Sequence, residues 1–150
     1  MLAAAVPATA QTFGFTLGTP PQACLSIGDA SYRVATTMLG ADLTVRIDPG
    51  VTASDIRIQF AETADEADFV FVDDGDAPPS CGGTRAKTVK IDPAASAPDL
   101  VVAFVPATAP ADYRIYVRSR LLRPEAAAAL FAAAHAPPRK LAGRVAIRSN

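Results

Sequence analysis

The middle of this 150-residue chain contains an internal duplication, which constrains its fold more than any other feature. Residues 44–74 align without a gap with residues 88–118, and ten of the 31 aligned positions are identical. Both copies contain an Asp-Pro pair, at Asp48 and Asp92, and this dipeptide occurs nowhere else in the chain. A repeated unit of this length does not bury its apolar face alone, so we expect the two copies to pack about a pseudo-twofold axis.

Each copy has the pattern of three short strands. Val45 and Ile47 alternate with polar residues, and this period of two is typical of a half-buried strand. Proline lacks an amide hydrogen, so the Asp-Pro pair ends the first strand. The second strands begin after Asp55 and Asp99 and are followed by a third strand in each copy. The connections between the second and third strands are shorter than a usual parallel crossover, which predicts hairpins.

The third strands of the two copies differ. Residues 69–72 are apolar on both faces, which predicts a central strand covered on both sides. Residues 113–118 alternate apolar and polar side chains, which predicts one face in water.

One helix is predicted, from Pro124 to Ala136, because proline opens the segment and Pro137-Pro138 ends it. It is rich in alanine, and an apolar stripe at helical spacing predicts that it covers the second face of strand 69–72. Further short strands are predicted at Tyr32–Met38 and Arg144–Arg148. The sequence therefore predicts a mainly β (α+β) fold of two duplicated three-stranded units and one helix. An α/β open sheet is the alternative.

The start of the chain and its two cysteines both suggest export. Residues 1–10 resemble the end of a secretory signal peptide, with Ala8 and Ala10 at the −3 and −1 positions of a cleavage site. Cys24 and Cys81 lack the spacing of a redox motif or metal site, so in an oxidising compartment we expect one disulfide. In the cytosol they would instead be two buried thiols. We expect a periplasmic or secreted protein with one β-rich domain over residues 11–150.

Composition argues against several functions. The chain has no Trp, 7 % aromatic residues and a formal net charge of −1, which argues against a nucleic-acid binder. No apolar run reaches the ~18–20 residues of a membrane-spanning helix. Two cysteines and one histidine leave a closed zinc site of these residue types one ligand short, so we predict neither a metal nor a cofactor.

Charge is segregated along the sequence. Residues 41–80 contain ten acidic and two basic side chains, and residues 111–150 contain eight basic and two acidic ones. The two sets either face each other within the chain or between copies, bind foreign partners of opposite charge, or form solvated faces. The candidate acidic patch is Asp65, Glu66, Asp68, Asp73, Asp74 and Asp76, and the candidate basic patch is Arg114, Arg118, Arg120 and Arg123.

No catalytic motif stands out, so we predict no catalytic residue. His135 lies in the last turn of the predicted helix, where the helix dipole alone favours it. Aspartates at equivalent positions of the two copies are the remaining candidates, because paired carboxylates can perform acid–base chemistry. These candidate repeat-junction carboxylates are Asp48, Asp55, Asp92 and Asp99. Aspartate beside proline also stabilises turns, which explains the same residues without chemistry.

These observations favour an exported, non-catalytic binding or assembly module. Its partner would be a protein or an anionic component of the cell envelope, such as phospholipid head groups or a polyanionic glycan. One alternative is a ligand-binding or hydrolytic protein that uses the repeat-junction carboxylates. The other is a structural subunit that self-associates head to tail through its acidic and basic segments.

Overall fold

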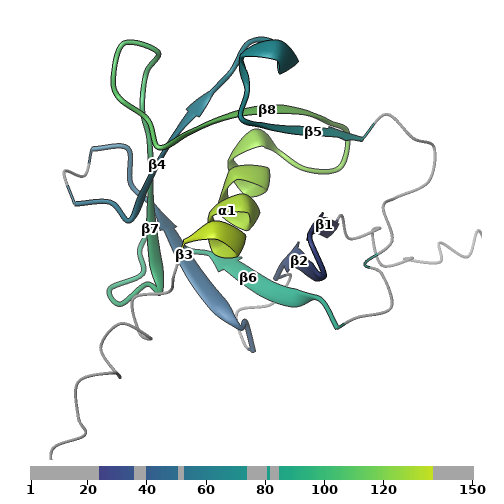
Figure 1. The fold of residues 1–150 in the computed structure, drawn as a ribbon. Coiled ribbons are helices and arrows are strands. Elements are labelled where there is room, and N and C mark those ends of the chain that lie inside the picture. The colour runs from purple at the N-terminus through teal and green to yellow at the C-terminus, as the bar shows by residue number, and fades with distance from the viewer. Residues whose placement is uncertain (1–23, 36–39, 51–52, 74–80, 82–84, 137–150) are drawn as a thin grey trace, which may run out of the picture.

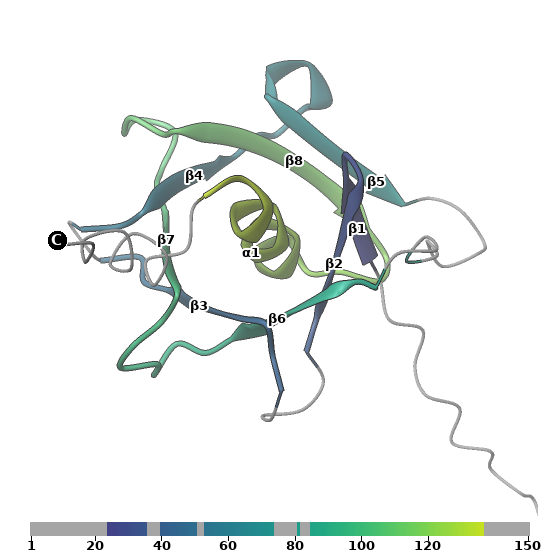
Figure 2. The ribbon, with the colours of Figure 1, turned by 60° about the horizontal axis from the view of Figure 1, so that its bottom comes forward.

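The computed structural model describes residues 24–35, 40–50, 53–73, 81 and 85–136 of the chain. In these residues eight strands form one curled sheet, and one α-helix lies on the concave side of the curl (Figures 1 and 2). The strands are β1 (Cys24–Ile27), β2 (Ala30–Val34), β3 (Leu43–Ile47), β4 (Ile56–Phe60), β5 (Phe69–Asp73), β6 (Lys87–Ile91), β7 (Leu100–Phe104) and β8 (Tyr113–Ser119). The helix α1 spans Pro124–His135, and a short 3-10 helix, η1, spans Ala64–Glu66. The predicted mainly β fold with one helix near the C-terminus is confirmed.

Strands of the two copies alternate across the sheet. The order is β1-β2-β6-β3-β7-β4-β8-β5, and every neighbouring pair from β2 to β5 is parallel. The chain first places β2, β3, β4 and β5 at every second position of the sheet, and β6, β7 and β8 then fill the positions between them. Strands of one copy therefore pair with strands of the other copy, so the sheet needs both copies to form its hydrogen bonds.

The predicted hairpins are wrong, because the sheet is strongly staggered. Phe60 at the end of β4 and Phe69 at the start of β5 both lie opposite Ile115 of β8. In the same way, Ile47 of β3 and Ile56 of β4 both lie opposite Val102 of β7. Each new strand thus starts level with the end of the previous one, and the connection only moves sideways past one strand, about 10 Å. A parallel crossover then needs no long return segment.

The two copies are related by a shift of one strand along the sheet. β6 lies beside its first-copy equivalent β3, β7 beside β4, and β8 beside β5, and the two strands of each pair run in the same direction. A twofold axis would instead place equivalent strands antiparallel to each other or on opposite sides of the curl. The pairing therefore differs from the pseudo-twofold relation that we expected.

The helix occupies the centre of the curl, as Figure 2 shows. Seven consecutive residues, Ala127 to Ala133, are buried, and Leu130 and Phe131 are among the most completely buried large side chains. Inward side chains of the sheet, among them Val45, Val89 and Ile115, pack against it. The burial extends beyond the predicted stripe because a helix enclosed by a sheet is apolar on all sides. Alanine suits this position, since its small side chain lets the strands approach closely.

The prediction that strand 69–72 is central is wrong. β5 is the last strand of the sheet, and its side chains alternate between half-buried and exposed. Phe69 contacts Phe131 of α1, with ring centroids 4.8 Å apart, so the helix covers only the concave face. Val70 and Val72 point to the convex face and are 44 % and 41 % exposed.

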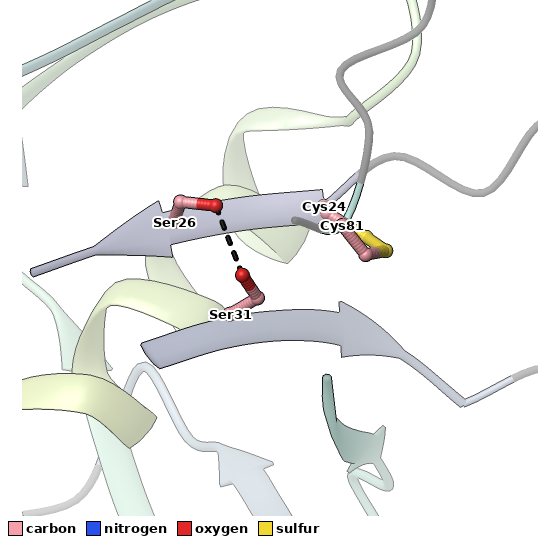
Figure 3. The surroundings of a disulfide bond; sticks show 4 residues. All are labelled: Cys24, Ser26, Ser31 and Cys81. Atoms are coloured by element: carbon pink, nitrogen blue, oxygen red, sulfur yellow. Dashed lines mark hydrogen bonds between the residues drawn. A yellow bond between two sulfur atoms is a disulfide. The ribbon is translucent and has the colours of Figure 1, made fainter. Parts of the chain in front are cut away.

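A disulfide joins Cys24 of β1 to Cys81 in the connection between β5 and β6, with the two Cα atoms 5.3 Å apart (Figure 3). Beside it, the Ser26 and Ser31 hydroxyl groups form a 3.0 Å hydrogen bond between β1 and β2. Because disulfides persist in oxidising compartments, the bridge points to a location outside the cytoplasm.

In the part of the chain that the structure describes, no helix has the length and apolarity needed to cross a membrane. The predicted signal-peptide remnant 1–10 and strand Arg144–Arg148 lie outside the described residues. β2 begins two residues before the strand predicted at Tyr32–Met38 and overlaps its first three residues, and residues 36–38 of that prediction also lie outside the described residues.

Candidate functional site

An aspartate directly precedes each of the last five parallel strands of the sheet. These leading aspartates are Asp42 before β3, Asp99 before β7, Asp55 before β4, Asp112 before β8 and Asp68 before β5. Each one is bonded to the second residue of the neighbouring strand on the β1 side of the sheet, at five equivalent junctions.

The junction between β3 and β7 shows the geometry. The backbone N–H of Thr44 donates to Asp99 Oδ2 at 2.8 Å, and the backbone N–H of Asp99 donates to the Thr44 carbonyl at 2.8 Å. The other four junctions repeat this reciprocal pair, with amide-to-carboxylate distances of 2.7–2.8 Å. The carboxylate thus stands in for a backbone carbonyl and satisfies an amide that would otherwise lack a partner at the start of a staggered strand.

The candidate repeat-junction carboxylates therefore have two different structural settings. Asp55 and Asp99 are leading aspartates and bond to Val101 and Thr44 of the neighbouring strands. Asp48 and Asp92 follow β3 and β6, where they accept from the backbone N–H two residues later, as aspartates in turns do. All four carboxylates accept hydrogen bonds from backbone amides, and Asp92 also forms an ion pair with Lys90.

Hydrogen bonds and nearby positive charges favour the ionised form of three aspartates, two of them leading aspartates and one in a turn. The backbone and hydroxyl groups of Thr88 lower the pKa of Asp42 below its usual 3.8. Hydrogen bonds from Arg57, whose Nη2 lies 3.2 Å from Oδ1, lower the pKa of Asp112. The Lys90 ammonium group, 2.8 Å from Asp92, lowers the pKa of that carboxyl. A lowered pKa does not suit a proton donor near neutral pH.

His135 lies at the end of α1 and packs against the preceding turn of the helix. Its ring stacks on Phe131 with centroids 4.1 Å apart, and Nδ1 lies 3.0 Å from the Phe131 carbonyl oxygen. Among the residues that the structure describes, no group of three or more His, Cys, Asp or Glu side chains is arranged to hold a metal ion.

The acidic and basic patches are adjacent in space rather than at opposite ends. The backbone N–H of Arg114 donates to Asp68, and that of Arg120 donates to Asp73 at 3.2 Å. The Ser119 hydroxyl also bonds to Asp73. This follows from the pairing of β5 with β8, which brings the acidic and basic segments side by side. Asp74 and Asp76 lie outside the described residues.

Exposed apolar side chains gather at the same corner of the sheet. Val70, Val72 and Leu121 are the exposed large apolar residues of the described chain. Leu121 belongs to the segment that turns past Asp73 after β8, and Val70 and Val72 lie opposite Tyr116 and Arg118. We call this region the β5 edge surface, defined as Val70, Val72, Tyr116 and Leu121 with the exposed Arg114, Arg118 and Arg120. Apolar groups rimmed by charge on an edge strand are typical of a protein interaction site.

Sequence reasoning identified the arginines of this surface but missed its valines. It treated them as core because nothing local distinguishes a covered strand from an edge strand. A finer period was available: β2, β3, β4 and β5 start 13 residues apart, as do β6, β7 and β8. Leading aspartates recur with this period, so a scan for Asp followed by alternating apolar residues would have found the junctions. Comparison of the chain with protein-family models, with curated proteins and with solved structures gives no match.

Proposed function

We propose that this protein is an exported, non-catalytic binding module that recognises an acidic protein partner through the β5 edge surface. The observation that carries the proposal is the coincidence, at one corner, of exposed valines, a tyrosine, arginines and the last strand of the sheet that the described residues form. Arginine and tyrosine are enriched at protein interfaces, because both combine apolar contact with hydrogen bonding. Export is proposed from the disulfide together with the signal-like residues at the start of the chain.

The arrangement of the charges supports a foreign partner over head-to-tail self-association. Head-to-tail assembly needs acidic and basic faces at opposite ends of the molecule. Here the paired strands β5 and β8 carry both sets, and Asp68 and Asp73 bond to the backbone of the basic segment.

A charge-reversal experiment tests the proposal. The disulfide-bonded full chain is immobilised, incubated with a soluble cell-envelope protein fraction or with anionic phospholipid vesicles, and washed with increasing salt. We expect retention of an acidic protein at low salt and its loss at high salt, because screening weakens charge pairing. The double variant R114E/R118E should lose the partner, whereas R85E, a reversal of another exposed arginine, should keep it.

Two results would overturn the proposal. Retention of the vesicles alone would assign the basic surface to the membrane. Equal retention of the acidic protein by R114E/R118E and by R85E would show that the β5 edge surface is not the binding site.

A further inference from the structure

The convex face of β5 resembles that of β7. They are the two strands of the described parallel sheet with apolar residues at both convex positions, Val70 and Val72 in β5 and Val101 and Ala103 in β7. In β7 these side chains are 0 % and 3 % exposed. β7 lies inside the sheet between β3 and β4, so the chain crosses β7 on its way from β3 to β4. β5 has the same apolar pattern but is the last strand of the sheet.

The series of hydrogen bonds between leading aspartates and neighbouring strands also ends at β5. In β7 the second residue, Val101, donates its backbone N–H to the leading Asp55 of the next strand at 2.7 Å. Its carbonyl accepts from the backbone N–H of Asp55 at 2.9 Å. The second residues of β6, β3, β4 and β8 make the same reciprocal pair with a leading aspartate. In β5 the second residue is Val70, and among the residues that the structure describes no further strand follows β5.

We propose that an extended segment of the acidic protein partner completes this edge, adding as a strand parallel to β5 with a carboxylate one residue before the strand. The inference rests on the proposed function and specifies how the partner binds. The incoming strand would form a sixth junction of the kind that the chain already forms five times. Its carboxylate would accept a hydrogen bond from the Val70 amide, and the residues before its strand would lie over the side chains of Val70 and Val72. Main-chain pairing at a sheet edge is an established way for domains to capture peptides.

Charge and symmetry favour a foreign acidic segment over a basic segment and over a second copy. Arg114 and Arg118 are exposed on β8, directly beside the edge, and they favour an acidic segment over a basic one. A second copy would bring its own β5 to this edge antiparallel, around a twofold axis. Its leading Asp68 would not be available, because it already accepts the N–H of its own Arg114.

The probe is a synthetic peptide with the sequence of residues 53–61, which contains β4 and its leading Asp55. β4 is the strand that follows β7 in the sheet, so it is the natural mimic of a strand that follows β5. We expect the peptide to bind the disulfide-bonded full chain and to shift the amide NMR signals of Val70 and Val72. Replacing its aspartate by alanine should weaken binding roughly tenfold or more, as expected for loss of a hydrogen bond to a charged group.

Two protein variants separate strand addition from simple side-chain contact. V70P removes the amide hydrogen on an edge strand, where proline is tolerated, and should weaken peptide binding roughly tenfold or more. V70T keeps that hydrogen and the β-branched shape, and should bind within about threefold of the unmodified chain. The aspartate-to-alanine peptide tests the same bond on the unmodified chain, so the inference stays testable if V70P does not fold.

The remaining outcomes would overturn the inference. Equal weakening by V70P and V70T would mean contact with the valine side chain only, and the proposed function would survive. Binding that is insensitive to both variants, or to the peptide carboxylate, would exclude strand addition at β5. A peptide-free dimer abolished by V70P would identify a second copy as the occupant.

Discussion

β5 and β7 have nearly the same apolar pattern and opposite surroundings. Val101 and Ala103 of β7 are buried inside the sheet, whereas Val70 and Val72 of β5 are more than 40 % exposed. An apolar pattern on both faces of a strand shows that the strand needs cover, but not which chain provides it. In β7 the cover is intramolecular. In β5 the same pattern becomes the centre of an interaction surface.

The largest expected effect on stability comes from replacing a valine by aspartate on the convex face of β7, compared with the same replacement in β5. Val101→Asp buries a carboxylate without a partner, and we expect it to lower the free energy of unfolding by about 3 kcal/mol or more. Val70→Asp places the charge in water and should change that free energy by no more than about 0.5 kcal/mol. Urea denaturation of the two variants measures both values. Equal losses would show that β5 is covered in the folded chain.

Removing the disulfide comes next, because the bridge joins β1, the first strand of the sheet, to the connection that leaves β5. Replacing Cys24 and Cys81 by serine opens a link across 57 residues and should lower the free energy of unfolding by about 2–4 kcal/mol. Hydrogen exchange should accelerate most in β1, which carries Cys24, and in its partner β2, and least in β7. Uniform acceleration across the sheet would contradict this local role.

The leading aspartates allow the same comparison between a central and an edge junction. Asp99 is 6 % exposed, and Asp99→Ala leaves the Thr44 amide without an acceptor, so we expect a loss of about 1–3 kcal/mol. Asp68 is exposed at the edge junction, where water can replace it, so Asp68→Ala should cost below about 1 kcal/mol. Asp99→Asn keeps an acceptor oxygen and should recover part of the loss. Thermal unfolding of the three variants ranks them, and a larger loss at Asp68 would invert the comparison.

The sequence predicts the strands well because their signals are local. Val45 and Ile47, or Val89 and Ile91, alternate with polar residues, and Asp-Pro ends each strand where the structure ends it. The strand order escaped prediction because it depends on stagger, which places Phe60 and Phe69 at the same level of β8. No single strand encodes that offset.

The candidate site was predicted only in part, for a related reason. The arginines of β8 were visible as a charge cluster, and Asp55 and Asp99 stood out as a repeated pair. Their partners are backbone amides of strands 46 or 55 residues away, which only the interleaved sheet brings together. Val70 and Val72 gave no signal of exposure, because the edge position of β5 follows from the order in which the two copies interleave.

The smallest expected effect is a pH dependence of the interior junctions. Hydrogen bonds from Thr88 and Arg57 lower the pKa values of Asp42 and Asp112 in the folded chain, so folding favours the ionised carboxylates. This stabilisation is present above the unfolded-state pKa near 3.8 and is lost as the pH falls through the lower folded-state values. Both side chains are solvent-exposed, so each should contribute only about 0.5 kcal/mol.

Asp42→Asn removes one titrating group. The difference in unfolding free energy between this variant and the unmodified chain should therefore shrink between pH 5 and pH 3, roughly the range over which such a carboxyl titrates. A difference that grows in acid would mean that Asp42 is better bonded when protonated, which would contradict the carboxylate role assigned to the leading aspartates.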